Sequence, residues 1–254
     1  MVKRIGLIAL CAIVSFSSFS QRRKKTAKAP LVFADSAAIQ RRSDSLIQMA
    51  KSADTLTDKE AEMGLKSYLQ TASAKSTEKL SATNGFLNNP LVKIGVPADD
   101  LKLERGLRSL GYAKQVDEAI ASMNLAAEDA TKSVAPLFDD AIKSSTINNA
   151  KQLLKGSDSS GSSYLRQAAT ASLTSSVRPI VVASIEKVGT AKYWTQAFAS
   201  VNKFGLNKTN TDLAGYITDK TIAGIFAQME KEEQSVRTSP ETKASPFYLK
   251  LNKL

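Results

Sequence analysis

The chain has 254 residues, of which 43% are hydrophobic and 23% are charged, and its formal net charge is +11. It contains no histidine and a single cysteine, Cys11. These counts exclude a Ser-His-Asp triad, Cys-His nucleophilic catalysis and zinc sites built from histidine and cysteine. They also exclude an internal disulfide, so the hydrophobic core alone must hold the fold.

The first 20 residues have the features of a secretory signal peptide. Lys3 and Arg4 form a basic head, an apolar run follows from Ile5 to Phe19, and Ser18-Phe19-Ser20 has the small-x-small pattern of a cleavage site. We therefore expect an exported protein, periplasmic or associated with the outer membrane. An uncleaved anchor is the alternative, although the apolar run is shorter than the ~20 residues that a spanning helix needs.

Residues 21–34 are predicted to be a basic, disordered linker, because Arg22-Arg23-Lys24-Lys25 is followed by Lys28. A solvated tail and a peripheral contact with an anionic surface both fit this charge. We expect no nucleic-acid partner for an exported protein. Residues 35–254 are predicted to form one helical domain, because alanine, serine, lysine and leucine dominate them.

The first part of this domain is predicted to contain two helices and a loop. Asp35-Ser36 can cap a short helix that runs to about Ser52, and Thr57-Asp58-Lys59-Glu60 is a capping box for a helix that runs to about Ala82. Residues 85–97 are apolar but lack a helical period. They predict an extended, partly buried loop, in which Val92–Ile94 could form a short strand.

A heptad pattern marks the clearest helix of the chain. A helix over residues 98–110 should end at Gly111, and a longer helix over residues 113–145 should follow. Pro136 lies inside the longer helix, so we expect a kink near Lys132. Its apolar seam comprises Val116, Ile120, Met123, Ala127, Ala130, Val134, Leu137 and Ala141.

The remaining sequence also favours helices. A short helix is expected at 147–155, followed by a Ser/Gly-rich turn at 157–163 and a long helix to about Val188 that is kinked at Pro179. An aromatic helix around Tyr193–Val201 and a polar loop at 204–211 should come next. A helix from Asp212 to about Val236 and a segment opened by Ser245-Pro246 complete the prediction. The predicted fold is therefore an all-α, single-domain bundle of long, kinked helices.

Several short motifs over residues 58–254 resemble an uncharacterised bacterial family, domain of unknown function 4197. The shared features are Gly85-Phe86-Leu87, Asn89-Pro90, Val92-Lys93-Ile94 and Pro97; Met123-Asn124-x-Ala126-Ala127-Glu128, Phe138 and Ala141-Ile142; Leu154-x-Gly156; Tyr164-x-Arg166 with Thr170; Pro179-Ile180-Val181; Tyr216; Gly224 with Phe226; and Glu232-Glu233 with Arg237. The resemblance implies an exported helical protein and supplies no known activity.

Asn124 and Glu128 form the first candidate ligand-binding pair. They are four residues apart and therefore lie on one face of the long helix, beside its seam. The pair could receive a polar ligand or a cation. The structural alternative, which we favour, is a hydrogen bond to a neighbouring helix or an ion pair between Glu128 and Lys132.

Tyr164 and Arg166 form the second candidate pair, at the start of a helix. The free N–H groups of a helix start can bind a phosphate or a carboxylate, and Arg166 could strengthen such a site. Capping of this helix by Asp158 or Ser159 is the alternative that we favour.

We identify no catalytic residue, no metal site and no cofactor from the sequence. Ser76-x-x-Lys79 and Ser184-x-x-Lys187 match a Ser-x-x-Lys pattern that chance also produces in a chain rich in both residues. The sequence favours a non-enzymatic protein that binds an envelope partner or a small ligand, or has a structural role. A hydrolase that uses carboxylates or a serine-lysine pair is the alternative.

Overall fold

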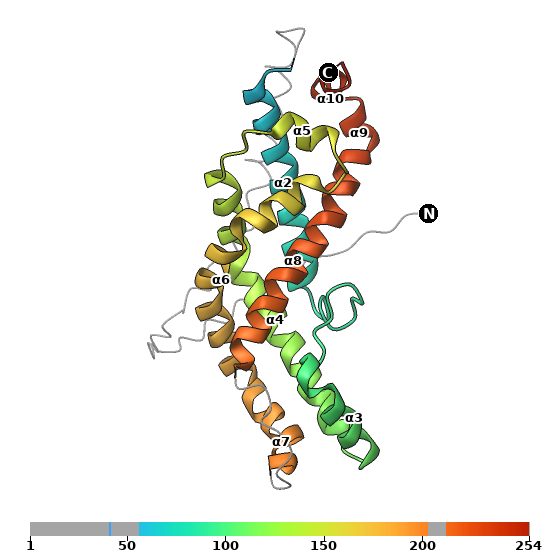
Figure 1. The fold of residues 1–254 in the computed structure, drawn as a ribbon, viewed down its shortest axis with the longest axis vertical. Coiled ribbons are helices and arrows are strands. Elements are labelled where there is room, and N and C mark those ends of the chain that lie inside the picture. The colour runs from blue at the N-terminus through green and yellow to red at the C-terminus, as the bar shows by residue number, and fades with distance from the viewer. Residues whose placement is uncertain (1–40, 42–55, 203–211, 254) are drawn as a thin grey trace, which may run out of the picture. The chain divides into compact units, whose positions relative to one another are not determined.

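The computed structural model describes residue 41, residues 56–202 and residues 212–253, and every regular element within these ranges is helical (Figure 1). The elements, in chain order, are α2 (Asp58–Ser81), the 3-10 helix η1 (Ala98–Asp100), α3 (Leu101–Ser109), α4 (Ala113–Ser144), α5 (Ala150–Lys155), α6 (Ser160–Val188), α7 (Thr190–Asn202), α8 (Leu213–Thr238), α9 (Pro240–Lys243) and α10 (Pro246–Leu251). The prediction of an all-α helical bundle is confirmed. The signal peptide, the basic linker, the helix expected at 35–52 (apart from residue 41) and the loop at 204–211 lie outside the described residues.

Local capping signals set several of the helix boundaries. At the start of α2, the Thr57 hydroxyl accepts from the Glu60 N–H (3.2 Å), and the Glu60 carboxylate accepts from the Thr57 N–H (2.8 Å). The Asp212 carboxylate accepts from the Gly215 N–H at the start of α8, and Ser245 caps α10 in the same way. The left-handed backbone of Gly189 (φ 76°) ends α6.

The seam of α4 is buried as predicted along its first half except at Ile120, which is partly buried, and it shifts by one position toward its end. Val116, Met123 and Val134 are fully buried, whereas Leu137 and Ala141 are only partly buried. Phe138 and Ile142 take their places in the core. This shift follows from helix geometry, because a straight helix drifts by about 20° per heptad relative to a 3.5-residue repeat.

Four long helices form the centre of the bundle. α4 packs against α2 and α6, and α8 packs against α2 and α6. By length and composition α6 could cross a membrane, but its buried face lies against α4 and α8. In Figure 1, α5, α9 and α10 lie at one end of the bundle beside the start of α2, and α3 and α7 lie at the other.

The last described helix, α10, packs against the start of α2. Phe247 of α10 fills the space above Gly64, where a Cβ atom would lie only 2.2 Å from the Phe247 Cζ atom. Tyr68 meets the same ring edge to face, with 5.8 Å between ring centroids. Beside them, Lys250 forms a buried ion pair with Glu60 (3.2 Å). Residues far apart in sequence therefore close this end of the bundle.

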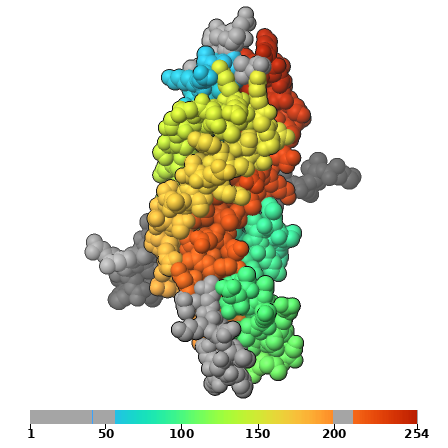
Figure 2. Space-filling model, in the orientation of Figure 1, coloured from blue at the N-terminus to red at the C-terminus, as the bar shows by residue number. Residues whose placement is uncertain are grey.

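The expected loop over residues 85–97 is present, but the short strand within it is not. The described backbone forms turns up to Val92 and is then extended without pairing to another strand. Phe86, Val92, Ile94 and Val96 are buried in the core. Figure 2 shows the loop (turquoise) directly beside α8 (orange-red). The strand prediction was wrong because side chains, described below, satisfy the loop's backbone groups.

Candidate functional site

Asn124 of α4 binds the backbone of the loop in two directions. Its side-chain oxygen accepts from the Ile94 N–H (2.9 Å), and its Nδ2 donates to the Ile94 carbonyl (2.8 Å). Nδ2 also donates to the Ile120 carbonyl, and the side chain is completely buried. The amide therefore replaces the strand partner that Ile94 lacks.

Glu128, one turn further along α4, holds the start of the same loop. Its carboxylate accepts from the backbone N–H groups of Asn84 (3.2 Å), Phe86 (3.2 Å) and Leu87 (3.5 Å), and only 4% of the residue is exposed. Lys132 pairs with Asp129 instead (3.7 Å). The expected helix-to-helix bond or ion pair with Lys132 was therefore wrong, because the turn at residues 84–87 offers three N–H donors.

α8 forms the other wall around this loop. The Tyr216 hydroxyl donates to the Gly95 carbonyl (3.0 Å), and Asn89 donates to the Gln228 side chain (3.3 Å). Gly224 lets Phe86 pack closely, since a Cβ atom at Gly224 would lie 2.9 Å from the Phe86 ring. The loop is thus clamped between α4 and α8 by polar contacts and close packing.

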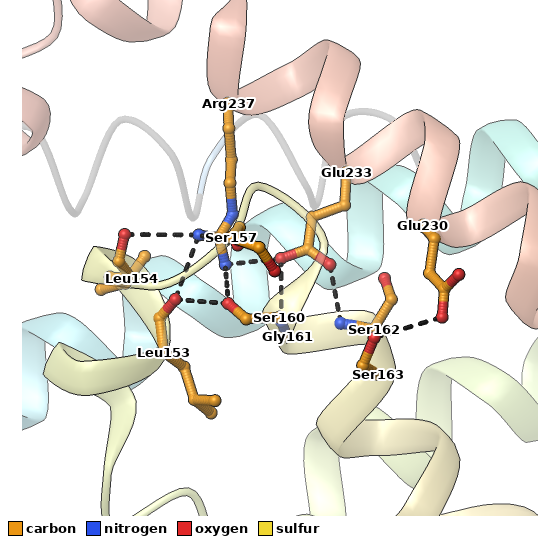
Figure 3. Close-up of polar contacts among 10 residues, drawn as sticks. All are labelled: Leu153, Leu154, Ser157, Ser160, Gly161, Ser162, Ser163, Glu230, Glu233 and Arg237. Atoms are coloured by element: carbon orange, nitrogen blue, oxygen red, sulfur yellow. Dashed lines mark hydrogen bonds and ion pairs between the residues drawn. The ribbon is translucent and has the colours of Figure 1, made fainter.

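A second buried glutamate, Glu233, caps the start of α6 (Figure 3). Its carboxylate accepts from the Gly161 N–H (3.2 Å) and from the Ser162 N–H (2.6 Å). The N-cap residue Ser159 makes no side-chain capping bond. Capping by Asp158 or Ser159 was therefore the wrong expectation. The helix start does hold a carboxylate, as its free N–H groups and dipole favour, but α8 supplies it.

Arg237 pairs with Glu233 one turn along α8, and both side chains are buried (5% and 0% exposed). Its guanidinium lies 2.5 Å from the Glu233 carboxylate and donates to the carbonyl groups of Leu153, Leu154 and Ser157 (Figure 3). The pair therefore joins the end of α5 to the start of α6, and the buried charges are neutralised and hydrogen-bonded.

Tyr164 and Arg166 both make internal contacts, but the Arg166 Nε atom is buried without a partner. The Tyr164 hydroxyl donates to the Thr146 carbonyl (3.1 Å). Arg166 pairs with Glu230 (3.0 Å) and lies 5.9 Å from the centre of the Phe226 ring. The Tyr164 side chain therefore contacts the connection between α4 and α5, and the Arg166 side chain contacts α8. Ligand binding by either predicted pair stays a prediction.

The Ser-x-x-Lys motifs are likewise engaged in other contacts. Ser76 donates to the Ala72 carbonyl, whereas Lys79 pairs with Glu232 (2.6 Å). Asp129 of α4 accepts from both Ser184 (3.2 Å) and Lys187 (2.6 Å) of α6. In the described part of the chain, no group of three or more acidic, histidine or cysteine side chains is placed to hold a metal ion.

A cavity of about 530 Å³ lies at the end of the bundle where α10 meets α2. We call it the C-terminal cavity. Tyr68 of α2, Arg237 of α8 and Tyr248 of α10 line it, together with residues of α5, of α9 and of the turn after α5. Its size falls within the usual range for small-molecule sites.

Two residues that line this cavity each carry a hydrogen-bond donor without a partner. The Tyr68 hydroxyl and the Arg237 Nε atom are both buried and make no hydrogen bond. Burial raises the pKa of Tyr68 to about 12, so its hydroxyl keeps its proton at neutral pH. Buried polar groups are nearly always satisfied in folded proteins, so two unpaired donors on residues that line one cavity mark it as a candidate binding site.

Sequence reasoning did not find this site. It included Arg237 only among the residues of the family resemblance and did not single out Tyr68. The spacing of Glu233 and Arg237, four residues apart on one helix, was the available signal for a buried pair. Nothing local to Tyr68 indicates that it lines a cavity together with residues of α5 and α10.

The fold and the sites define an all-α protein that clamps a long loop between two helices and has a partly open cavity at one end. A family model described as a protein of unknown function (DUF4197) matches residues 55–251, and the chain belongs to this family. Comparison with curated proteins and with solved structures gives no significant match.

Proposed function

We propose that the protein is an exported helical protein that binds a small ligand in the C-terminal cavity and does not catalyse a reaction on it. The observation that carries the binding role is a cavity of about 530 Å³ lined by two residues, Tyr68 and Arg237, that each carry a buried hydrogen-bond donor without a partner. The basic head, the apolar run and the small-x-small pattern of the first 20 residues support export.

The use of the buried carboxylates favours binding over catalysis. Glu60, Glu128 and Glu233 are buried, and each accepts hydrogen bonds from backbone N–H groups that hold elements together. Glu232 is occupied by Lys79 and Gln228. A general acid or base must reach the proton that it transfers, and these four carboxylates are committed to the fold.

A ligand screen on two variants tests the binding role. Gly156 lines the mouth of the cavity, is exposed and has a φ of −73°, so Gly156→Trp should partly fill the mouth without straining the backbone. We expect some small molecules in a chemically mixed library to raise the melting temperature of the native chain and not that of Gly156→Trp. A library with no such compound would contradict the binding role.

Intact-mass measurement of the protein from its natural cells tests export separately. Exported material should lack the first 20 residues and begin at Gln21, and its N-terminal glutamine can cyclise. A full-length chain confined to the cytoplasm would contradict export and leave the binding role untouched.

A further inference from the structure

We propose that the C-terminal cavity takes a small organic anion, namely a carboxylate or phosphate group carried on a short apolar body. This inference rests on the proposed binding function and names its ligand class. Three features of the cavity carry it: the unpaired groups are donors, the free charges at the mouth are mainly positive, and part of the wall is apolar.

The unpaired groups require acceptor atoms in the ligand. An arginine Nε can only donate a hydrogen bond, and a protonated tyrosine hydroxyl donates when an acceptor is offered. Both the Arg237 Nε atom and the Tyr68 hydroxyl lack an acceptor. Both atoms are covered in the structure, so a small movement of the two side chains would let a ligand oxygen satisfy groups that the fold leaves unpaired. A cationic ligand would offer no such acceptor.

The charges around the mouth favour an anion. Lys155 and Lys243 line the cavity, are exposed, and take part in no ion pair or hydrogen bond with their side chains in the described part of the chain. Asp158 is the carboxylate that lines the same cavity, and it too is exposed. Since Glu233 already balances the Arg237 charge, the two lysines leave a positive excess for the ligand.

The rest of the wall fits an apolar body. Leu154 and Leu251 are buried core residues that also line the cavity, and the rings of Tyr68 and Tyr248 add to them. Inorganic phosphate alone would leave this surface without contacts. A carboxylate or phosphate attached to a ring or a short chain would use both the donors and the apolar wall.

Calorimetric titration of the purified full chain tests the proposal with three probes that share one ring. Phenyl phosphate and benzoate carry an anionic group, whereas benzyl alcohol is neutral. We expect saturable binding of at least one anion, with benzyl alcohol weaker by about tenfold or more, because hydrogen bonds to charged groups are the stronger ones. The ratio between the two anions tells which headgroup the cavity prefers.

Variants connect that binding to this cavity. Tyr68→Phe and the double variant Lys155→Ala/Lys243→Ala should each weaken anion binding by about tenfold, with melting temperatures close to that of the native chain. Lys192→Ala is the matched control, because this exposed lysine lies on α7 at the other end of the bundle. It should leave binding unchanged.

Three results would overturn the proposal: benzyl alcohol binding as tightly as the anions, anion binding that survives all cavity substitutions, or no saturable binding of either anion. If benzyl alcohol binds as tightly as the anions and Gly156→Trp abolishes its binding, only the proposed ligand class fails and the binding role stands. The binding role itself fails only when the mixed library also yields no cavity-dependent compound.

Discussion

At the scale of single residues, Asn124 illustrates how one side chain can replace a stretch of secondary structure. Its amide pairs with both backbone groups of Ile94 and is fully buried. The loop can therefore cross the core without a neighbouring strand. The resemblance to the family included Asn124 and Ile94 as separate motifs, and the fold brings them into direct contact.

Removing this amide should destabilise the protein strongly. Asn124→Ala leaves the N–H and the carbonyl of Ile94 buried without partners, so we expect a loss of about 2 to 5 kcal/mol in the free energy of unfolding. Urea denaturation followed by circular dichroism measures it. Leu125→Ala, at a half-exposed position on the same helix, is the control and should change far less. Equal losses for both variants would contradict the role of the amide.

Glu60 should make stability depend on pH in the acid range. Burial alone raises the pKa of Glu60, but the hydrogen bonds from Thr57 and the contact with Lys250 outweigh it and hold the pKa below its ordinary value of 4.5. A carboxyl with a lowered folded-state pKa stabilises the fold above its unfolded-state pKa. That contribution is lost as the pH falls through the folded-state value.

We therefore expect the free energy of unfolding to fall as the pH drops below about 4.5, and to fall less steeply in Glu60→Gln. Denaturant titrations at several pH values between about 6 and 3 provide the measurement. The hydrogen bonds from Arg178 also lower the pKa of Asp212, so in Glu60→Gln the free energy of unfolding should still fall with pH, but less steeply. An identical slope in both proteins would rule out the proposed contribution of Glu60.

At the scale of elements, the buried face of α4 is the part on which the bundle depends most. Met123 lies mid-helix with no exposed surface. Met123→Asp buries an unpaired charge there and should cost several kcal/mol, enough to prevent folding of a protein of ordinary stability. Leu125→Asp is the matched control, because this neighbour is 51% exposed. Circular dichroism should show loss of helix in the first variant alone.

The joint between α5, α6 and α8 depends on the Glu233–Arg237 pair. Arg237→Met leaves a buried carboxylate without its counter-charge, so the single change should cost about 3 to 5 kcal/mol. In a double-mutant cycle with Glu233→Gln, the double variant should cost less than the sum of the two single changes.

The Lys114–Glu118 pair, with the same spacing and an exposed position, is the control for this cycle and should contribute less than about 1 kcal/mol. Additive losses at Glu233 and Arg237 would mean that the two side chains act independently.

At the scale of the whole molecule, the sequence predicted what is local and missed what is assembled from distant segments. The capping box at Thr57, the cap at Asp212 and the α-helix of α4 depend on neighbouring residues, and all three are confirmed, although the seam of α4 shifts toward its end. The partners of Glu128 and Glu233 are backbone groups more than 40 residues away, which no local pattern specifies. The cavity needs α2, α5 and α10 together, so it could not be predicted from any one of them.

The close approach of Phe247 to Gly64 also makes the C-terminal cavity depend on the packing of α10 against α2. Lys250 and its partner Glu60 are 190 residues apart, so a chain made or threaded from its N-terminus presents α2 long before α10 exists. Until the final residues arrive, Gly64 faces an open groove and the cavity lacks the wall that Tyr248 and Leu251 supply. The cavity is therefore complete only when α10 has packed against α2.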